Sequence, residues 1–163
     1  MNDELLQRIV EEVVARLRQR ADSAIALSVA QLRETPSRTL FCRYAALHVL
    51  QADLSLLRQI AENDRSDSAA ALLHDALASG LRVRISLQRA LLPALPVKKL
   101  ARLPLTFCDE QGMRVMLHPT RLVTYADVVR SDHGLLVLPR KCIVTALARD
   151  AASSRNIQFF KQE

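Results

Sequence analysis

The stretch SDSAAALLHDALASGLRVRISL, residues 66–87, decides the class of fold because a helix pattern runs directly into a strand pattern. Asp67 precedes a run rich in alanine and leucine and can cap a helix there, and Gly80 suits the residue that follows a helix. In the last seven residues apolar side chains alternate with Arg82 and Arg84, which is typical of a strand with one solvated face.

The same alternation of helices and strands continues through most of the chain. Further helices are predicted at 53–64, 124–130 and 146–155, the first of them capped by Asp53. Strands are predicted at 25–29, 39–43, 46–50 and 81–87, at 105–108 and 113–117 as a hairpin, within 135–145, and at 156–161. We therefore expect an α/β or α+β fold in which helices partly cover a sheet.

Residues 2–20, NDELLQRIVEEVVARLRQR, are predicted to form an amphipathic helix, and Asn2 can cap it through its side chain. One half of the helical wheel is apolar, and the other half carries Glu4, Gln7, Arg8, Glu11 and Arg18. We predict that this apolar half docks on a partner protein through Leu5, Leu6, Ile9, Val10, Val13 and Leu17. The alternatives are that it folds back on its own sheet or pairs with a second copy. The chain then divides into a docking helix, 1–20, and a single α/β domain, 22–163.

Composition excludes several other classes of protein. The 163 residues carry a net charge of +6, but arginine is interleaved with acidic residues and no aromatic stacking platform accompanies it, so we expect no specific nucleic-acid binding. No apolar run approaches the ~20 residues that span a bilayer, and the N-terminus is acidic, so we expect an intracellular protein that binds no membrane. Cys42, Cys108 and Cys142 are expected to be buried, reduced and structural.

Catalytic signals are weak throughout the sequence. The three glycines are isolated, so no phosphate-binding loop is present, and the four histidines are dispersed without metal-ligand spacing. Cys108, Asp109 and Glu110 form the best local cluster, which is typical of a buried strand end entering an acidic turn. We expect no catalytic residue, no cofactor and no metal, and thus a protein that is not an enzyme.

Two segments resemble proteins of bacterial microcompartments. ELLQRIVEEVVARL resembles the N-terminal targeting helices of their cargo enzymes. LVTYADVVR, followed by LLVLPRKCIVTALARDAASSRNIQFF, resembles a segment of microcompartment-associated proteins, with Tyr125 where Glu is usual and Ala146 where Pro is usual. Over its whole length the chain is similar to the structural-protein family of the propanediol-utilisation microcompartment.

That resemblance implies a non-enzymatic assembly component of a compartment for coenzyme-B12-dependent 1,2-propanediol degradation. Such a component would link shell or cargo proteins inside the compartment within the cytoplasm, and a second copy of the chain is a further expected partner. The alternative is an α/β protein or enzyme of the same compartment that binds cobalamin or a nucleotide. The small number of glycines favours the assembly component.

Overall fold

A seven-stranded sheet runs through the body of the protein in the computed structural model, which describes residues 2–163. Its order is β1-β2-β3-β4-β5-β7-β9, and all neighbours are parallel except the β4–β5 hairpin. The strands are β1 Ala24–Ser28, β2 Ala46–Leu50, β3 Arg82–Ser86, β4 Leu105–Cys108, β5 Arg114–Leu117, β7 Gly134–Leu138 and β9 Ile157–Lys161. The predicted fold class, a sheet partly covered by helices, is confirmed.

Helices connect most of these parallel strands, as parallel pairing requires. They are α2 Val29–Glu34, α3 Ser37–Arg43, α4 Leu54–Ala61, α5 Ser68–Ala78, the 3-10 helix η1 Arg89–Ala94, α6 Val97–Leu100, α7 Tyr125–Val129 and α8 Ala146–Ser154. The caps predicted for α4 and α5 are confirmed. A carboxylate oxygen of Asp53 accepts from the Leu56 amide at 2.8 Å, and one of Asp67 accepts from the Ala69 amide at 2.8 Å.

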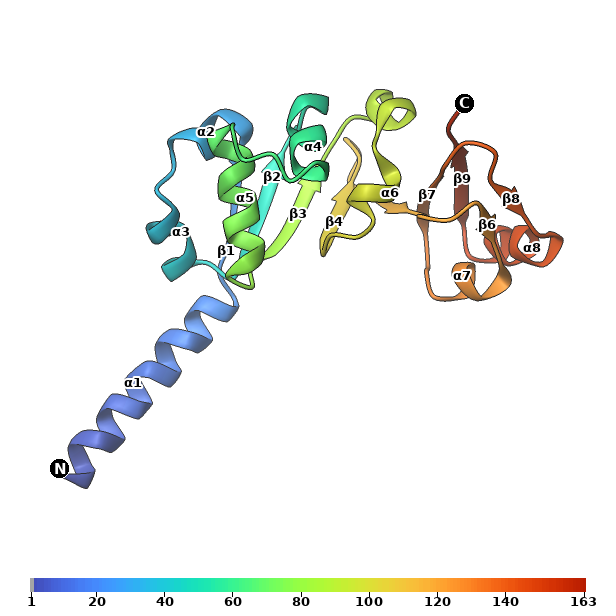
Figure 1. Ribbon diagram of the computed structural model, residues 1–163. Coiled ribbons are helices and arrows are strands. Elements are labelled where there is room, and N and C mark those ends of the chain that lie inside the picture. Colours follow the sequence, from blue (N-terminus) through green and yellow to red (C-terminus); the bar gives the residue numbers. More distant parts are fainter. Residues whose placement is uncertain (1) are drawn as a thin grey trace.

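The main core lies between the sheet and the helices α4 and α5, which Figure 1 shows in front of β2 and β3. Val83 and Ile85 of β3 are buried in this core, whereas Arg82 and Arg84, which alternate with them, are exposed. The predicted alternation is therefore confirmed. Parallel sheets are usually covered on both faces, but here the arginine side of β3 faces solvent.

The C-terminal end of the sheet is covered on both faces. Leu135 and Val137 of β7 belong to the main core, while Leu136 and Leu138 belong to a second cluster that includes residues of α7 and α8. Two short parallel strands, β6 Leu122–Val123 and β8 Ile143–Val144, form a separate pair beside these helices. Each strand leads through one threonine into a helix, so two similar strand–threonine–helix units lie at this end (Figure 1).

Two sequence predictions are wrong in the segment after β1. The strand predicted at 39–43 belongs to the helix α3, which follows Pro36 at the N-cap and buries Leu40, because seven residues are too few to show a helical period in the sequence. Leu40 is the buried residue of α3, and Cys42, predicted to be buried, is exposed on its solvent side. Cys108 and Cys142 are buried as expected, and burial raises the pKa of the Cys142 thiol.

Candidate partner-binding helix

The predicted N-terminal helix is present as α1, Asp3–Ala21, with an acidic first turn and a basic last turn. Both turns therefore complement the helix dipole. Asn2 occupies the N-cap position, but its side chain accepts no hydrogen bond, so the predicted side-chain cap is wrong. An Arg16 Nη2 donates to a Glu12 carboxylate oxygen at 2.6 Å, one turn along the helix, and both side chains are exposed.

None of the described residues of α1 is buried, although half of its surface is apolar. Each of the six predicted anchors is about half exposed, from 48% for Leu6 to 56% for Leu17. Val14, which extends the same face, is 38% exposed. The apolar face therefore does not fold back on the chain's own sheet.

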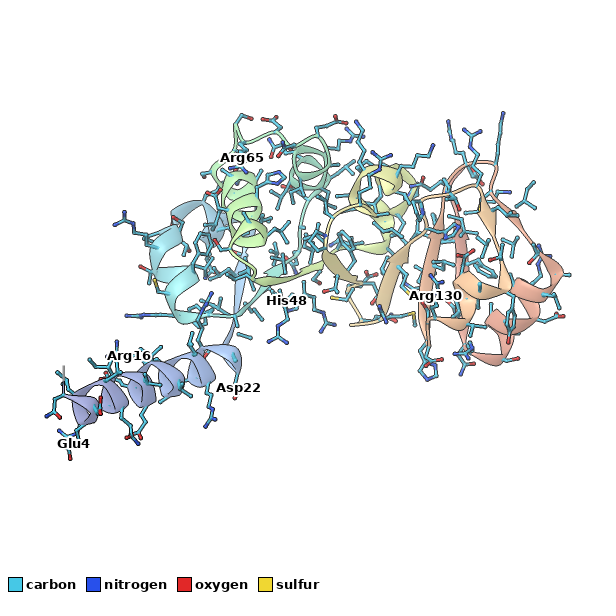
Figure 2. The ribbon with its side chains drawn as sticks, turned by 60° about the horizontal axis from the view of Figure 1, so that its bottom comes forward. Glu4, Arg16, Asp22, His48, Arg65 and Arg130 are labelled. Atoms are coloured by element: carbon cyan, nitrogen blue, oxygen red, sulfur yellow. The ribbon has the colours of Figure 1, made fainter. Side chains whose placement is uncertain are left out.

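A short, hydrogen-bonded junction joins α1 to the body. The Ser23 Oγ donates to the Gln19 carbonyl at 2.7 Å, and an Arg82 Nη2 donates to the Ala21 carbonyl at 3.2 Å. Strand β1 begins at Ala24, so only two residues separate helix from sheet. Figure 1 shows α1 extending away from the body, and in Figure 2 Glu4 lies at the free end and Asp22 beside the body.

A second group of exposed apolar side chains, which the sequence analysis missed, lies at the C-terminal end. Leu122 and Ile143 are register partners across the β6–β8 pair and are 48% and 66% exposed. Tyr125 and Leu147 belong to the helices that follow these strands, and both are also exposed. The repeated LVT and IVT sequences that precede the two helices are the signal that could have revealed this pairing.

The Cys108–Asp109–Glu110 cluster lies where β4 enters the β4–β5 turn, and its Asp109 stabilises that turn. The Asp109 carboxylate accepts from Arg89 Nε at 2.8 Å and from the amides of Gln111 and Met113 at 2.9 and 2.8 Å. Burial alone would raise the pKa of Asp109, but these hydrogen bonds outweigh burial and hold its pKa below the ordinary value. Asp109 is therefore a structural anchor of the turn.

Cys108 instead lies near a histidine from a distant strand. Its Sγ is 3.9 Å from His48 Nε2, and burial together with the nearby Arg84 charge lowers the pKa of His48. No hydrogen-bond partner that would orient the His48 ring is found among the described residues, so the pair lacks the third member of a catalytic set.

Within residues 2–163, no group of three or more histidine, cysteine, aspartate or glutamate side chains is arranged to hold a metal ion. No helix in the same range is long and apolar enough to cross a membrane.

Fold and surface together define an α/β protein with a projecting amphipathic helix whose apolar face is left exposed by the described residues 2–163. The chain belongs to the family described as putative propanediol utilisation, whose model matches residues 8–158. It is 60% identical to the bacterial microcompartment assembly protein PduM of Citrobacter freundii and 55% identical to the protein of the same name from Salmonella typhimurium, over the full length of all three chains. No solved structure matches it significantly.

Proposed function

We propose that this chain is a non-enzymatic assembly component of the propanediol-utilisation microcompartment and that α1 attaches it to another protein of that compartment, either a shell or a cargo protein. The observation that carries the proposal is the half-exposed apolar face of α1 on a helix that projects from a folded body. The family membership and the names of the two relatives support the compartment as its location.

An apolar helix face of this kind favours a protein groove as its binding site. Amphipathic helices are commonly recognised when their apolar side chains enter such a groove. Complete burial of one aliphatic side chain contributes roughly 1.5–3 kcal/mol relative to full exposure, and α1 offers six anchors that are each about half exposed. Losses of motion on binding offset much of this gain, so a contact of micromolar strength, reinforced by many copies in one assembly, is sufficient.

The charges of α1 favour a protein partner over a lipid surface. Helices that lie on membranes usually carry a polar face rich in lysine and arginine. The polar half of α1 instead includes Glu4, Glu11 and Glu12 beside its arginines, and these carboxylates would be repelled by anionic lipid headgroups.

The test compares two double variants of the full chain in cells that assemble compartments. Ile9→Asp with Val13→Asp places two carboxylates in the apolar face, and Gln7→Asp with Ala15→Asp places the same number on the polar half. We expect the first variant to be largely absent from purified compartments and the control to be recovered like the wild type, with both bodies folded. Equal recovery of the two variants would refute docking through this face. Unfolding of the first variant alone would show that α1 belongs to the core.

A further inference from the structure

The apolar face of α1 contains a narrower seam with coiled-coil spacing. Leu6, Val10, Val13 and Leu17 follow one another at intervals of four, three and four residues, which is the a/d pattern of a heptad repeat. Leu5 and Ile9 lie to one side of this seam. The face is therefore wide enough to contact two partners at once.

The charges along α1 are separated into two halves. All four of its acidic residues lie within residues 3–12, whereas three of its four arginines lie within residues 16–20. If two such helices pair in antiparallel orientation, the acidic half of each lies alongside the basic half of the other, and the two charges in line with the seam, Asp3 and Arg20, face each other. A parallel pair would place like charges side by side, which is unfavourable.

The residue layers of an antiparallel pair match along the whole seam. Leu6 faces Leu17 of the second copy, and Val10 faces Val13 of the second copy. One layer beyond the apolar residues, three residues from Leu6 and three from Leu17, Asp3 of one helix faces Arg20 of the other at both ends of the pair. The seam is thus closed at each end by opposite charges.

The base of α1 already provides a site for the acidic end of a second helix. A hollow between the last turn of α1 and the end of α3 is lined by Arg16, Arg20 and Arg43, and no carboxylate is among its described lining residues. The Arg20 Nε is buried and has no hydrogen-bond partner among the described residues. A carboxylate from the first turn of another α1 would supply a hydrogen-bond acceptor and a negative charge for these arginines.

We infer that two copies of this chain associate through an antiparallel pair of α1 helices, with the acidic first turn of each helix seated at the arginine-lined hollow of the other. This inference deepens the proposed function and rests on it for one point. The pair takes up four of the six anchors and leaves Leu5 and Ile9 beside the seam to contact the other compartment protein. The dimer would then present two binding sites for that protein, one formed by Leu5 and Ile9 of each copy.

Sedimentation of the purified full chain, without compartments, tests the pairing. The wild type should sediment as a dimer at a protein concentration of roughly tens of micromolar. Asp3→Lys and Arg20→Glu should each weaken the dimer by about tenfold, because each puts like charges in both end layers. The control Arg18→Glu reverses a charge in the same last turn but on the polar half, and should leave the dimer intact.

The mixture of the two weakened variants is the decisive sample. Asp3→Lys carries a basic residue at both ends of the seam and Arg20→Glu an acidic one, so an antiparallel heterodimer restores opposite charges in both end layers. We expect the mixture to dimerise about as strongly as the wild type, which a folding defect in either variant cannot produce.

A monomeric wild type, or a mixture no stronger than its components, would overturn the pairing. Either result leaves the proposed function standing, because recovery with compartments is measured separately. Conversely, a dimer that is not recovered with compartments would refute the proposed function and leave the pairing intact.

Discussion

Helices α4 and α1 are both amphipathic, but the apolar half of α4 is buried and that of α1 is exposed. Both place aliphatic side chains on one half of the helix and polar ones on the other. In α4 the apolar half is buried, with Leu56, Leu57 and Ile60 each no more than 1% exposed. In α1 none of the described apolar side chains is buried.

The connection of each helix to the sheet explains this difference. Helix α4 lies in the crossover between the parallel strands β2 and β3, and such a connection has to return across one face of the sheet. Helix α1 precedes the first strand, so no later strand requires it to cross the sheet. The amphipathic pattern therefore shows which face of a helix is apolar, and the chain connectivity decides whether the body itself can cover that face.

Matched truncations of the two helices should give the largest contrast in stability. Leu57→Ala removes a fully buried side chain and should lower the free energy of unfolding by about 2–5 kcal/mol. Leu6→Ala should change it by less than about 0.5 kcal/mol. Denaturant titration at low protein concentration, where self-association adds nothing, measures both. A large loss for Leu6→Ala would place α1 in the core.

The helix caps should show a smaller contrast. Asp67 caps α5 and also accepts from Arg33 of α2, with Arg33 Nη2 at 3.0 Å. Asp67→Ala should therefore cost about 1–2 kcal/mol, whereas Asn2→Ala, at a cap without a side-chain bond, should cost almost nothing. If both variants lost the same free energy of unfolding in this assay, the Asn2 side chain would be shown to stabilise α1.

The loss caused by Asp67→Ala should also depend on pH. The hydrogen bond from Arg33 lowers the pKa of Asp67. The contribution of the Arg33–Asp67 interaction to the free energy of unfolding is therefore fully present above the pKa of an aspartate in an unfolded chain, roughly 3.9. This contribution disappears as the pH falls through the lower pKa of Asp67 in the folded state. The difference between wild type and variant should shrink in acid. A difference that stays constant there would contradict the Arg33 interaction.

Removal of residues 1–20 should have the smallest effect on folding. The division into a helix, 1–20, and a domain, 22–163, remains a prediction, and it requires that the truncated chain unfold in one cooperative thermal transition near that of the full chain. We expect this because no described residue of α1 is buried as a whole, so the helix contributes little to the core of the body. A broad or absent transition would show that the body needs α1.

Sequence reasoning succeeded where local chemistry specifies structure. The aspartate caps of α4 and α5 and the alternation of β3 were read directly from neighbouring residues. It failed at α3, where a helix of seven residues has too few turns to show its period, and at β6, a strand of two residues.

The surface was less predictable than the fold. The apolar face of α1 is evident from its period, but nothing local indicates that the body leaves it uncovered. The exposed pair Leu122 and Ile143 depends on the register of two parallel strands that are far apart in sequence. The 3.9 Å approach of His48 to Cys108 likewise depends on the strand order β2-β3-β4.

The recovery of the protein with purified compartments, with and without residues 1–20, tests most directly whether α1 attaches the body to its assembly. If α1 provides the attachment, the truncated chain will be folded in the cytoplasm but recovered with compartments at roughly a tenth of the full-length level or less, because avidity is lost with the contact. Recovery of the folded, truncated chain at the full-length level would contradict attachment through α1.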